Sequence, residues 1–209
     1  MLGVFVAQVF AGLVLAGLFA AFLGWHALAG WARDTARVVR KGRRGQWTVT
    51  WWVGGALVVA FWSVGVLLLP EYAYHWPNLP DFPYSAVLQV IGYCIVLAGG
   101  ALFFLAIRAL GPHMTPVIQL REGHRLVQSG PYRYIRHPAY TAILTGGFGQ
   151  ALLYLSLPLA LITLLLVALA TYRAQVEEEL LSSPEAFGAE YVSYASRTGR
   201  FLPRLRSRA

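Results

Sequence analysis

The sequence predicts an all-α membrane protein, a polytopic helical bundle with about five transmembrane helices. Of the 209 residues, 57% are hydrophobic and only 12% are charged, about half the charged fraction of a soluble domain. Several apolar runs are long enough to cross the hydrocarbon core of a bilayer as helices. The period-two alternation of apolar and polar residues that is typical of membrane strands is not seen.

Three apolar runs in the first half of the chain predict the first three spans. They cover 2–24, 51–70 and 84–107. At about 1.5 Å per residue, each is long enough to cross about 30 Å of hydrocarbon. The single cysteine, Cys94, lies in the third run, so no internal disulfide is possible.

The stretch 138–172 contains no charged side chain and is too long for one span. Pro158 interrupts it, because proline cannot donate a hydrogen bond to the preceding turn. We therefore expect a short helical hairpin that forms spans four and five, 138–154 and 158–173. The second of these helices should continue past the membrane edge as a polar helix to Leu181, and the fold should include a cytosolic C-terminal helix.

Basic residues are distributed unevenly between the loops, and this distribution sets the expected orientation. Segments 32–46 and 108–136 and the tail after Tyr172 are rich in arginine, whereas 71–83 contains neither Lys nor Arg. The net charge of +8 thus fits the positive-inside rule without a nucleic-acid partner. We expect an integral, multi-pass membrane protein with its N-terminus outside and its C-terminus in the cytosol.

Polar side chains gather where the predicted hairpin begins and where it ends. The stretch 124–140 reads HRLVQSGPYRYIRHPAY, and Arg173 and Glu177 lie one helical turn apart at the end of span five. Because the two hairpin helices run antiparallel, both groups should meet at one cytosolic mouth. Arg136 and His137 should lie at the N-terminus of span four, whose amides favour an anionic group.

Each of these residues also has an ordinary structural explanation. Arg136 alone could be a positive-inside anchor and His137 a helix cap. Arg173 and Glu177 could be a surface ion pair. Their grouping at both ends of one hairpin favours a site, because polar groups between membrane spans are costly. Three other histidines and the cysteine lack partners at metal-ligand spacing, so no metal is expected.

The stretch 124–140, followed by Arg173 and Glu177 and by a Phe-Gly, Tyr and Arg motif within 187–203, resembles the isoprenylcysteine carboxyl methyltransferase family. The resemblance covers roughly residues 115–203. Members of that family are polytopic enzymes that methylate the C-terminal carboxylate of a prenylated cysteine with S-adenosylmethionine. The resemblance therefore implies an S-adenosylmethionine-dependent methyltransferase that forms a methyl ester at the membrane–cytosol interface.

Carried over by position, the resemblance implies a methyl-donor site on the loop before span four and the start of that span. Its residues are Gln119, His124, Arg125, Leu126, Val127, Tyr132, Arg136, His137, Pro138, Ala139 and Tyr140. Arg173 and Glu177 match the pair that the family places beside the reacting carboxylate. Arg173 is expected to hold that carboxylate, and Glu177 to fix Arg173 or to bind a donor amine. Ala142 departs from the family, which usually has glycine at this position.

On this interpretation, 1–110 supplies three N-terminal transmembrane helices, and 111–209 supplies the donor-binding loop, the hairpin and the C-terminal helix. The expected partners are membrane lipids and a lipid-soluble methyl acceptor, such as a prenylated cysteine, that enters from the bilayer. Three alternatives stay open: a methyltransferase for a phospholipid amine or small thiol, a nicotinamide-dependent membrane reductase, and a non-catalytic transporter. A transporter would need polar groups along the bilayer midplane, and Arg173 favours a carboxylate acceptor over an amine.

Overall fold

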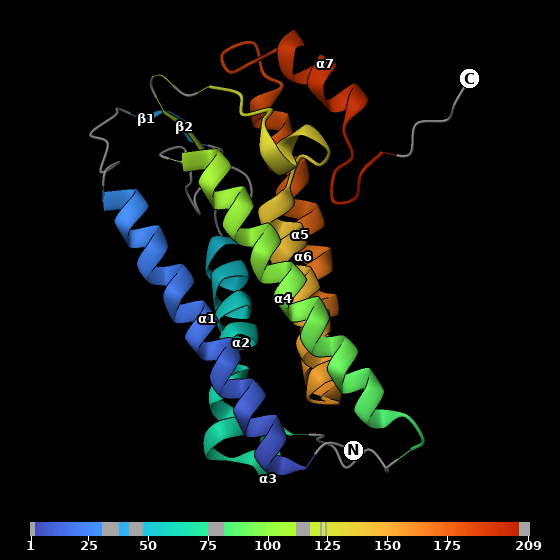
Figure 1. The fold of residues 1–209 in the computed structure, drawn as a ribbon. Coiled ribbons are helices and arrows are strands. Elements are labelled where there is room, and N and C mark those ends of the chain that lie inside the picture. Colours follow the sequence, from blue (N-terminus) through green and yellow to red (C-terminus); the bar gives the residue numbers. More distant parts are fainter. Residues whose placement is uncertain are drawn as a thin grey trace.

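The described part of the chain folds as a bundle of five long helices with small elements at its ends (Figure 1). The structure, a computed structural model, describes residues 3–30, 38–41, 48–74, 82–111, 118–121, 123 and 125–204. Its elements are α1 (Val4–Gly30), β1 (Val38–Lys41), α2 (Thr48–Leu68), α3 (Pro70–Ala73), α4 (Ser85–Leu110), β2 (Gln119–Arg121), the 3-10 helix η2 (Gly130–Arg133), α5 (Pro138–Leu153), α6 (Leu157–Leu181) and α7 (Ala189–Arg197).

The predicted hairpin is present as α5 and α6. Helix α5 ends at Leu153, and Pro158 lies in the first turn of α6, where its missing N–H is no loss. The hydroxyl of Ser156, the N-cap residue, accepts a hydrogen bond from the backbone N of Leu159 at 3.4 Å. Helix α6 then continues to Leu181, as the sequence predicts.

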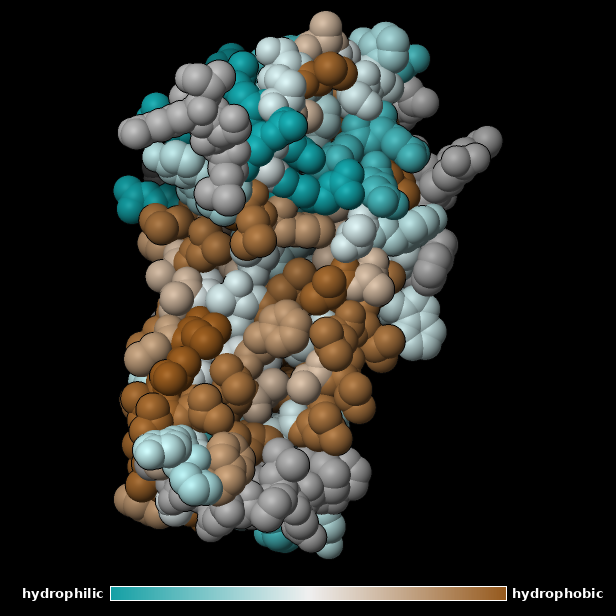
Figure 2. Space-filling view, turned by 90° about the vertical axis from the view of Figure 1, so that its right-hand side faces the viewer, coloured by the Kyte–Doolittle hydropathy of each residue, from teal (hydrophilic) through white to brown (hydrophobic). Residues whose placement is uncertain are grey.

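Three helices, α2, α4 and α6, are long and apolar enough to cross a membrane. The apolar part of α1 with described side chains, Val4–Gly17, and helix α5 are shorter, so the count of five spans stays a prediction. Figure 2 shows hydrophobic side chains over most of the bundle and a hydrophilic cap at the end that carries α7. The protein is therefore a membrane protein, whereas the side of the membrane that this cap faces stays a prediction.

Helices α4 and α5 pack with their backbones in close approach. A Cβ added to Gly92 would lie 2.5 Å from the backbone N of Leu153, and one added to Gly99 would lie 3.0 Å from the carbonyl O of Ala142. Small residues at such positions let two membrane helices approach closely. Helix α4 therefore holds α5 from its second turn to its C-terminal end.

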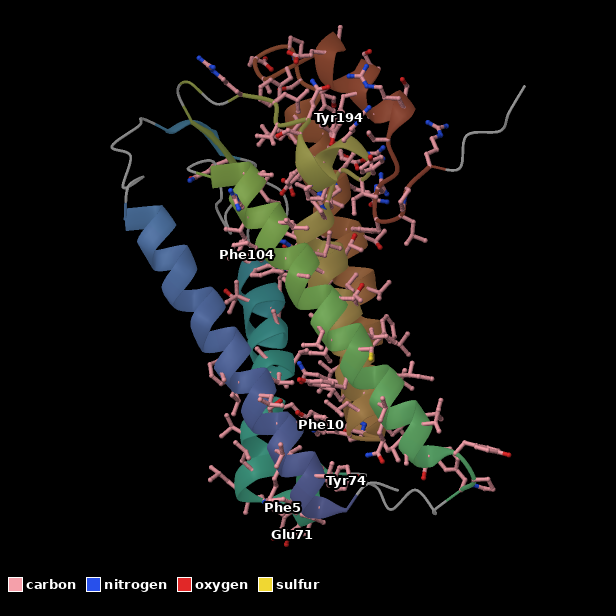
Figure 3. The ribbon with its side chains drawn as sticks, viewed as in Figure 1. Phe5, Phe10, Glu71, Tyr74, Phe104 and Tyr194 are labelled. Carbon is pink, nitrogen blue, oxygen red and sulfur yellow. The ribbon has the colours of Figure 1, made fainter. Side chains whose placement is uncertain are left out.

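Buried side-chain hydrogen bonds fasten the end of the bundle away from α7. The hydroxyls of Ser63 and Tyr154 lie 2.6 Å apart, and Nε2 of Gln89 donates to the hydroxyl of Tyr74 at 2.6 Å. Figure 3 shows Tyr74 at this end and Tyr194 at the other. These contacts tie the α5–α6 turn to α2 and the start of α4 to the segment after α3.

A short two-stranded antiparallel ribbon departs from the all-helical expectation. Strands β1 and β2 pair with Val38 opposite Arg121 and Lys41 opposite Gln119. The sequence shows no period-two pattern here because strands of four and three residues are too short for an alternation to be seen. The bundle itself is all-helical, as the sequence predicts. The ribbon joins the segment after α1 to the segment before α5.

Candidate active site

A cavity lies at the α7 end of the bundle, where α5 begins and α6 ends. Its empty space is about 770 Å³, a figure that includes open solvent at its mouth. Pro138 and Ala139 form the first turn of α5 without lining it, and His124 lies outside the described residues. The predicted site residues that line it are Gln119, Arg125, Leu126, Val127, Tyr132, Arg136, His137, Tyr140, Arg173 and Glu177.

Sequence reasoning missed several other residues that line the cavity. Tyr191 and Tyr194 lie three residues apart on α7, so both face inward, and they are only 3% and 2% exposed. Their spacing within the Phe-Gly, Tyr and Arg motif is a signal that could have identified them. The missed lining residues are Leu110, Ile118, Leu180, Leu181, Phe187, Tyr191 and Tyr194.

Arg173 places a buried cation in the wall of the cavity. Its side chain is 1% exposed, and its Nη1 donates a hydrogen bond to Oγ1 of Thr48, the first residue of α2, at 2.9 Å. A guanidinium has five N–H donors in one plane, so this contact helps to fix the orientation of the group. Helix α2, for which the sequence suggested no functional residue, thus reaches the site.

Tyr140 connects the first turn of α5 to the end of α6. Its hydroxyl donates a hydrogen bond to Oε2 of Glu177 at 3.0 Å. Its ring stacks on the ring of His137, with 5.3 Å between centroids, and Trp52 packs edge-on against it at 4.9 Å. Nδ1 of His137 lies 3.6 Å from the same oxygen of Glu177. These contacts orient the Glu177 carboxylate, whose side chain is 34% exposed.

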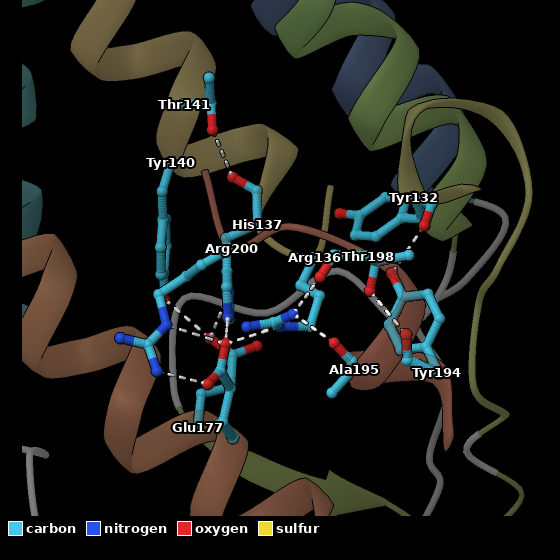
Figure 4. Close-up of polar contacts among 11 residues, drawn as sticks. Tyr132, Arg136, His137, Tyr140, Thr141, Glu177, Tyr194, Ala195, Thr198 and Arg200 are labelled. Atoms are coloured by element: carbon cyan, nitrogen blue, oxygen red, sulfur yellow. Dashed lines mark hydrogen bonds and ion pairs between the residues drawn. The ribbon is translucent and has the colours of Figure 1, made fainter. Parts of the chain in front are cut away.

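Glu178 is the centre of an ionic network that sequence reasoning missed; Figure 4 labels its partners Arg136, His137 and Arg200. Its Oε1 lies 2.9 Å from Nε of Arg136 and 3.1 Å from Nε2 of His137, while Nη2 of Arg200 lies 2.7 Å from its Oε2. Hydrogen bonding to Glu178 raises the pKa of Arg200 above its ordinary value. Successive helical residues are rotated by about 100°, so Glu177 faces Tyr140 and Glu178 faces the two arginines, while His137 lies near both carboxylates.

Arg136 joins this network to the end of α7. Besides Glu178, its guanidinium donates hydrogen bonds through Nη1 to the carbonyls of Ala195 at 2.9 Å and Thr198 at 2.5 Å. The side chain also lines the cavity. Much of its donor capacity is therefore used within the protein, which fixes α6 and α7 around the cavity.

The segment after α7 is tied to the start of α5. Ile135 and Gly199 form a parallel bridge, and the backbone N of Arg136 donates to the carbonyl of Gly199 at 2.8 Å. One turn into α5, Oγ1 of Thr141 donates to the carbonyl of Phe201 at 2.9 Å. The C-terminal segment consequently holds the helix end that borders the cavity.

The wall of the cavity formed by η2 and α7 is aromatic and uncharged. The hydroxyl of Tyr194 donates to the carbonyl of Tyr132 at 2.7 Å. Burial raises the pKa of Tyr194 to about 12 and also raises the pKa of Tyr132. Both phenols are therefore neutral at physiological pH, in contrast to the ionic wall that α5 and α6 supply.

Comparison with known proteins shows a similarity to a methyltransferase family. Residues 90–183 match the sequence profile of the isoprenylcysteine carboxyl methyltransferase family. The match begins within α4 and stops before α7, so it leaves α1, α2 and α7 outside.

Three curated relatives illustrate the similarity, and each bears the name protein-S-isoprenylcysteine O-methyltransferase. The Saccharomyces cerevisiae protein is 29% identical over 156 residues, which are 71% of this chain and 64% of the relative. The Xenopus laevis protein is 31% identical over 64% of this chain and 46% of the relative. The Homo sapiens protein is 30% identical over 61% of this chain and 44% of the relative. The chain thus spans about half to two thirds of the length of these relatives.

Proposed function

We propose that the chain is a member of the isoprenylcysteine carboxyl methyltransferase family, which it resembles in sequence, and that it methylates the C-terminal carboxylate of a lipidated cysteine with S-adenosylmethionine. One observation carries the proposal beyond the family match. A single cavity at the polar end of a membrane bundle contains a buried cation, Arg173, together with the carboxylate of Glu177 and an aromatic wall. Glu177 and the aromatic wall suit the charged methyl donor, and Arg173 suits the carboxylate of a lipid-linked acceptor.

The residues of the cavity fit the methyl donor. Glu177 offers a carboxylate to the ammonium of the donor, and Tyr140 fixes its position through the 3.0 Å hydrogen bond. The uncharged aromatic wall of Tyr132 and Tyr194 suits a flat purine. When bound, S-adenosylmethionine supplies a methyl group activated by a sulfonium. The remaining donor-site residues proposed from the resemblance are Gln119, His124, Arg125, Leu126, Val127, Arg136, His137, Pro138 and Ala139.

Arg173 binds and orients the acceptor in this proposal. Its planar guanidinium can grip a carboxylate with two parallel hydrogen bonds, which a lysine cannot do. The burial of Arg173 keeps water away from the pair. A carboxylate oxygen of the acceptor forms a bond to the methyl carbon while the bond from that carbon to sulfur breaks.

This transfer needs neither a general base nor a metal ion. A carboxylate is already ionised at pH 7, so no proton has to be removed. The reaction neutralises one positive and one negative charge, and a water-poor cavity with a low dielectric constant favours that neutralisation. The protein therefore contributes mainly by aligning the two reactants.

The proposed acceptor enters sideways from the bilayer, with its apolar tail between the helices and its carboxylate in the hydrophilic cap. The cap then faces the cytosol, as the arginine-rich loops predict, and membrane lipids surround the bundle. Region 111–209 carries most of the site, while α2 in region 1–110 supplies Thr48 beside Arg173.

Donor binding and product chemistry test this proposal against the alternatives. Calorimetric titration of the purified protein should show binding of S-adenosylmethionine and none of NADPH, and the reverse result would point to a reductase. With a radiolabelled methyl group and a panel of prenylcysteine analogues, the product should release its label in base, as a methyl ester does. Base-stable label would indicate an amine or thiol acceptor instead.

Thr48→Val should lower kcat/KM for the methyl acceptor by about 10- to 100-fold, because a hydrogen bond to a charged group is lost. The isosteric change keeps the packing but removes the oxygen that accepts from Nη1 of Arg173. Initial rates at saturating donor measure the effect, and Thr48→Ser should recover most of the activity. Thr163→Val is the matched control, since among the described residues that buried hydroxyl bonds only to the carbonyl of Leu159, at 2.8 Å in its own helix.

A further inference from the structure

Tyr191 carries a buried hydroxyl that no described part of the protein satisfies. The side chain lines the cavity and the residue is only 3% exposed, yet its phenolic oxygen has no hydrogen-bond partner within the described residues. A buried polar group without a partner is costly, and most buried polar groups in proteins have one. Phenylalanine would fill the same space without this cost, so packing does not account for the hydroxyl.

Two other buried tyrosines have hydroxyls that are hydrogen-bonded within the protein. Tyr194, one turn further along α7, donates to the carbonyl of Tyr132 at 2.7 Å. Tyr154, at the opposite end of the bundle, is paired with the hydroxyl of Ser63 at 2.6 Å. Tyr191 packs against Tyr194 with 5.9 Å between ring centroids and lines the cavity, but its buried hydroxyl has no such partner among the described residues.

The polarity of the cavity indicates which part of a ligand meets this hydroxyl. Phe187, Tyr191 and Tyr194 provide aromatic surface from α7 and the segment before it. Arg173 and Glu177 provide charge from α6. A ligand with a flat base at one end and a charged group at the other would place its base and sugar against the aromatic wall.

We propose that Tyr191 binds the methyl donor by donating a hydrogen bond from its hydroxyl to the nucleoside part of that molecule. This inference rests on the proposed function. It adds a residue that contacts the methyl donor and that lies outside the stretch 90–183, which matches the family. Burial and the nearby carboxylates of Glu178 and Glu177 raise the pKa of Tyr191, so the phenol keeps its proton and acts as a donor.

The test compares Tyr191→Phe with Tyr154→Phe, using S-adenosylhomocysteine as the calorimetric probe. Tyr191→Phe should weaken its binding by about tenfold without lowering the melting temperature of the ligand-free protein, because no bond inside the protein is lost. Tyr154→Phe should do the opposite, since it breaks the contact with Ser63 but lies outside the cavity. Methylthioadenosine, which keeps the nucleoside and lacks the amino-acid end, should show the same tenfold ratio.

Each outcome separates this inference from the proposed function. Equal affinity of wild type and Tyr191→Phe for S-adenosylhomocysteine would overturn the role of Tyr191 and leave the methyltransferase proposal intact. A lower melting temperature of ligand-free Tyr191→Phe would show that the hydroxyl already has a hydrogen-bond partner within the protein. If Tyr191→Phe lost affinity for S-adenosylhomocysteine but not for methylthioadenosine, a contact with the nucleoside would be excluded. If wild type binds neither probe nor S-adenosylmethionine, the proposed function itself fails and this inference with it.

Discussion

Arg173→Ala should reduce kcat/KM for the methyl acceptor on the order of 10²–10³-fold, a loss comparable to that of a preorganised charge-binding donor in other enzymes. The guanidinium is 1% exposed and held by Thr48, so its position is set before any ligand arrives. A small side chain in its place leaves the acceptor carboxylate without a partner in a water-poor cavity. Initial rates with a prenylcysteine analogue measure the effect.

Two further measurements separate a role in acceptor binding from a general defect. The affinity for S-adenosylmethionine should stay within about twofold of wild type. The substitution removes a contact with the acceptor, and in this proposal other residues bind the methyl donor. Expression and the size-exclusion profile should also be unchanged. Arg173→Lys should recover little activity, since an ammonium keeps the charge but lacks the planar fork. Near-normal turnover of Arg173→Ala would exclude this residue from acceptor binding.

The helices of this fold follow closely from the sequence. Apolar runs of sufficient length fix α2 and α4, and Pro158 fixes the break between α5 and α6. Signals of this kind are local, because they depend on hydrophobic length and on backbone hydrogen bonds. The ribbon β1–β2 has no such signal, since it joins two segments that are far apart in the sequence.

The site was predictable only in part, and the reason is geometric. The antiparallel hairpin brings His137 and Arg173 into one cavity, as expected from the topology. The partners of individual side chains depend on rotation about the helix axis and on distant backbone. Glu178, next to Glu177 in sequence, is paired with Arg200 from a segment beyond α7, and no local pattern reveals that pairing.

Replacing Glu178 should have the largest effect on stability. The isosteric change Glu178→Gln removes the negative charge that lies between Arg136, His137 and Arg200 and leaves the two guanidinium groups facing one another. The side chain is 15% exposed, so we expect a loss of about 2–3 kcal/mol, somewhat less than for a fully buried pair. That loss corresponds to a fall in melting temperature of about 5–10 °C, measurable by thermal unfolding in detergent.

The network also predicts how variants combine. Glu179→Gln, at an exposed neighbouring position on α6, should leave the melting temperature unchanged. Arg200→Ala should cost about 1 kcal/mol, because its side chain is 33% exposed and partly solvated. The double variant Glu178→Gln/Arg200→Ala should be little less stable than Glu178→Gln alone, since both changes remove the same contact and the repulsion between the cations is relieved. Additive losses would mean that Glu178 and Arg200 stabilise the protein independently, so that the C-terminal segment is not held to α6 through this pair.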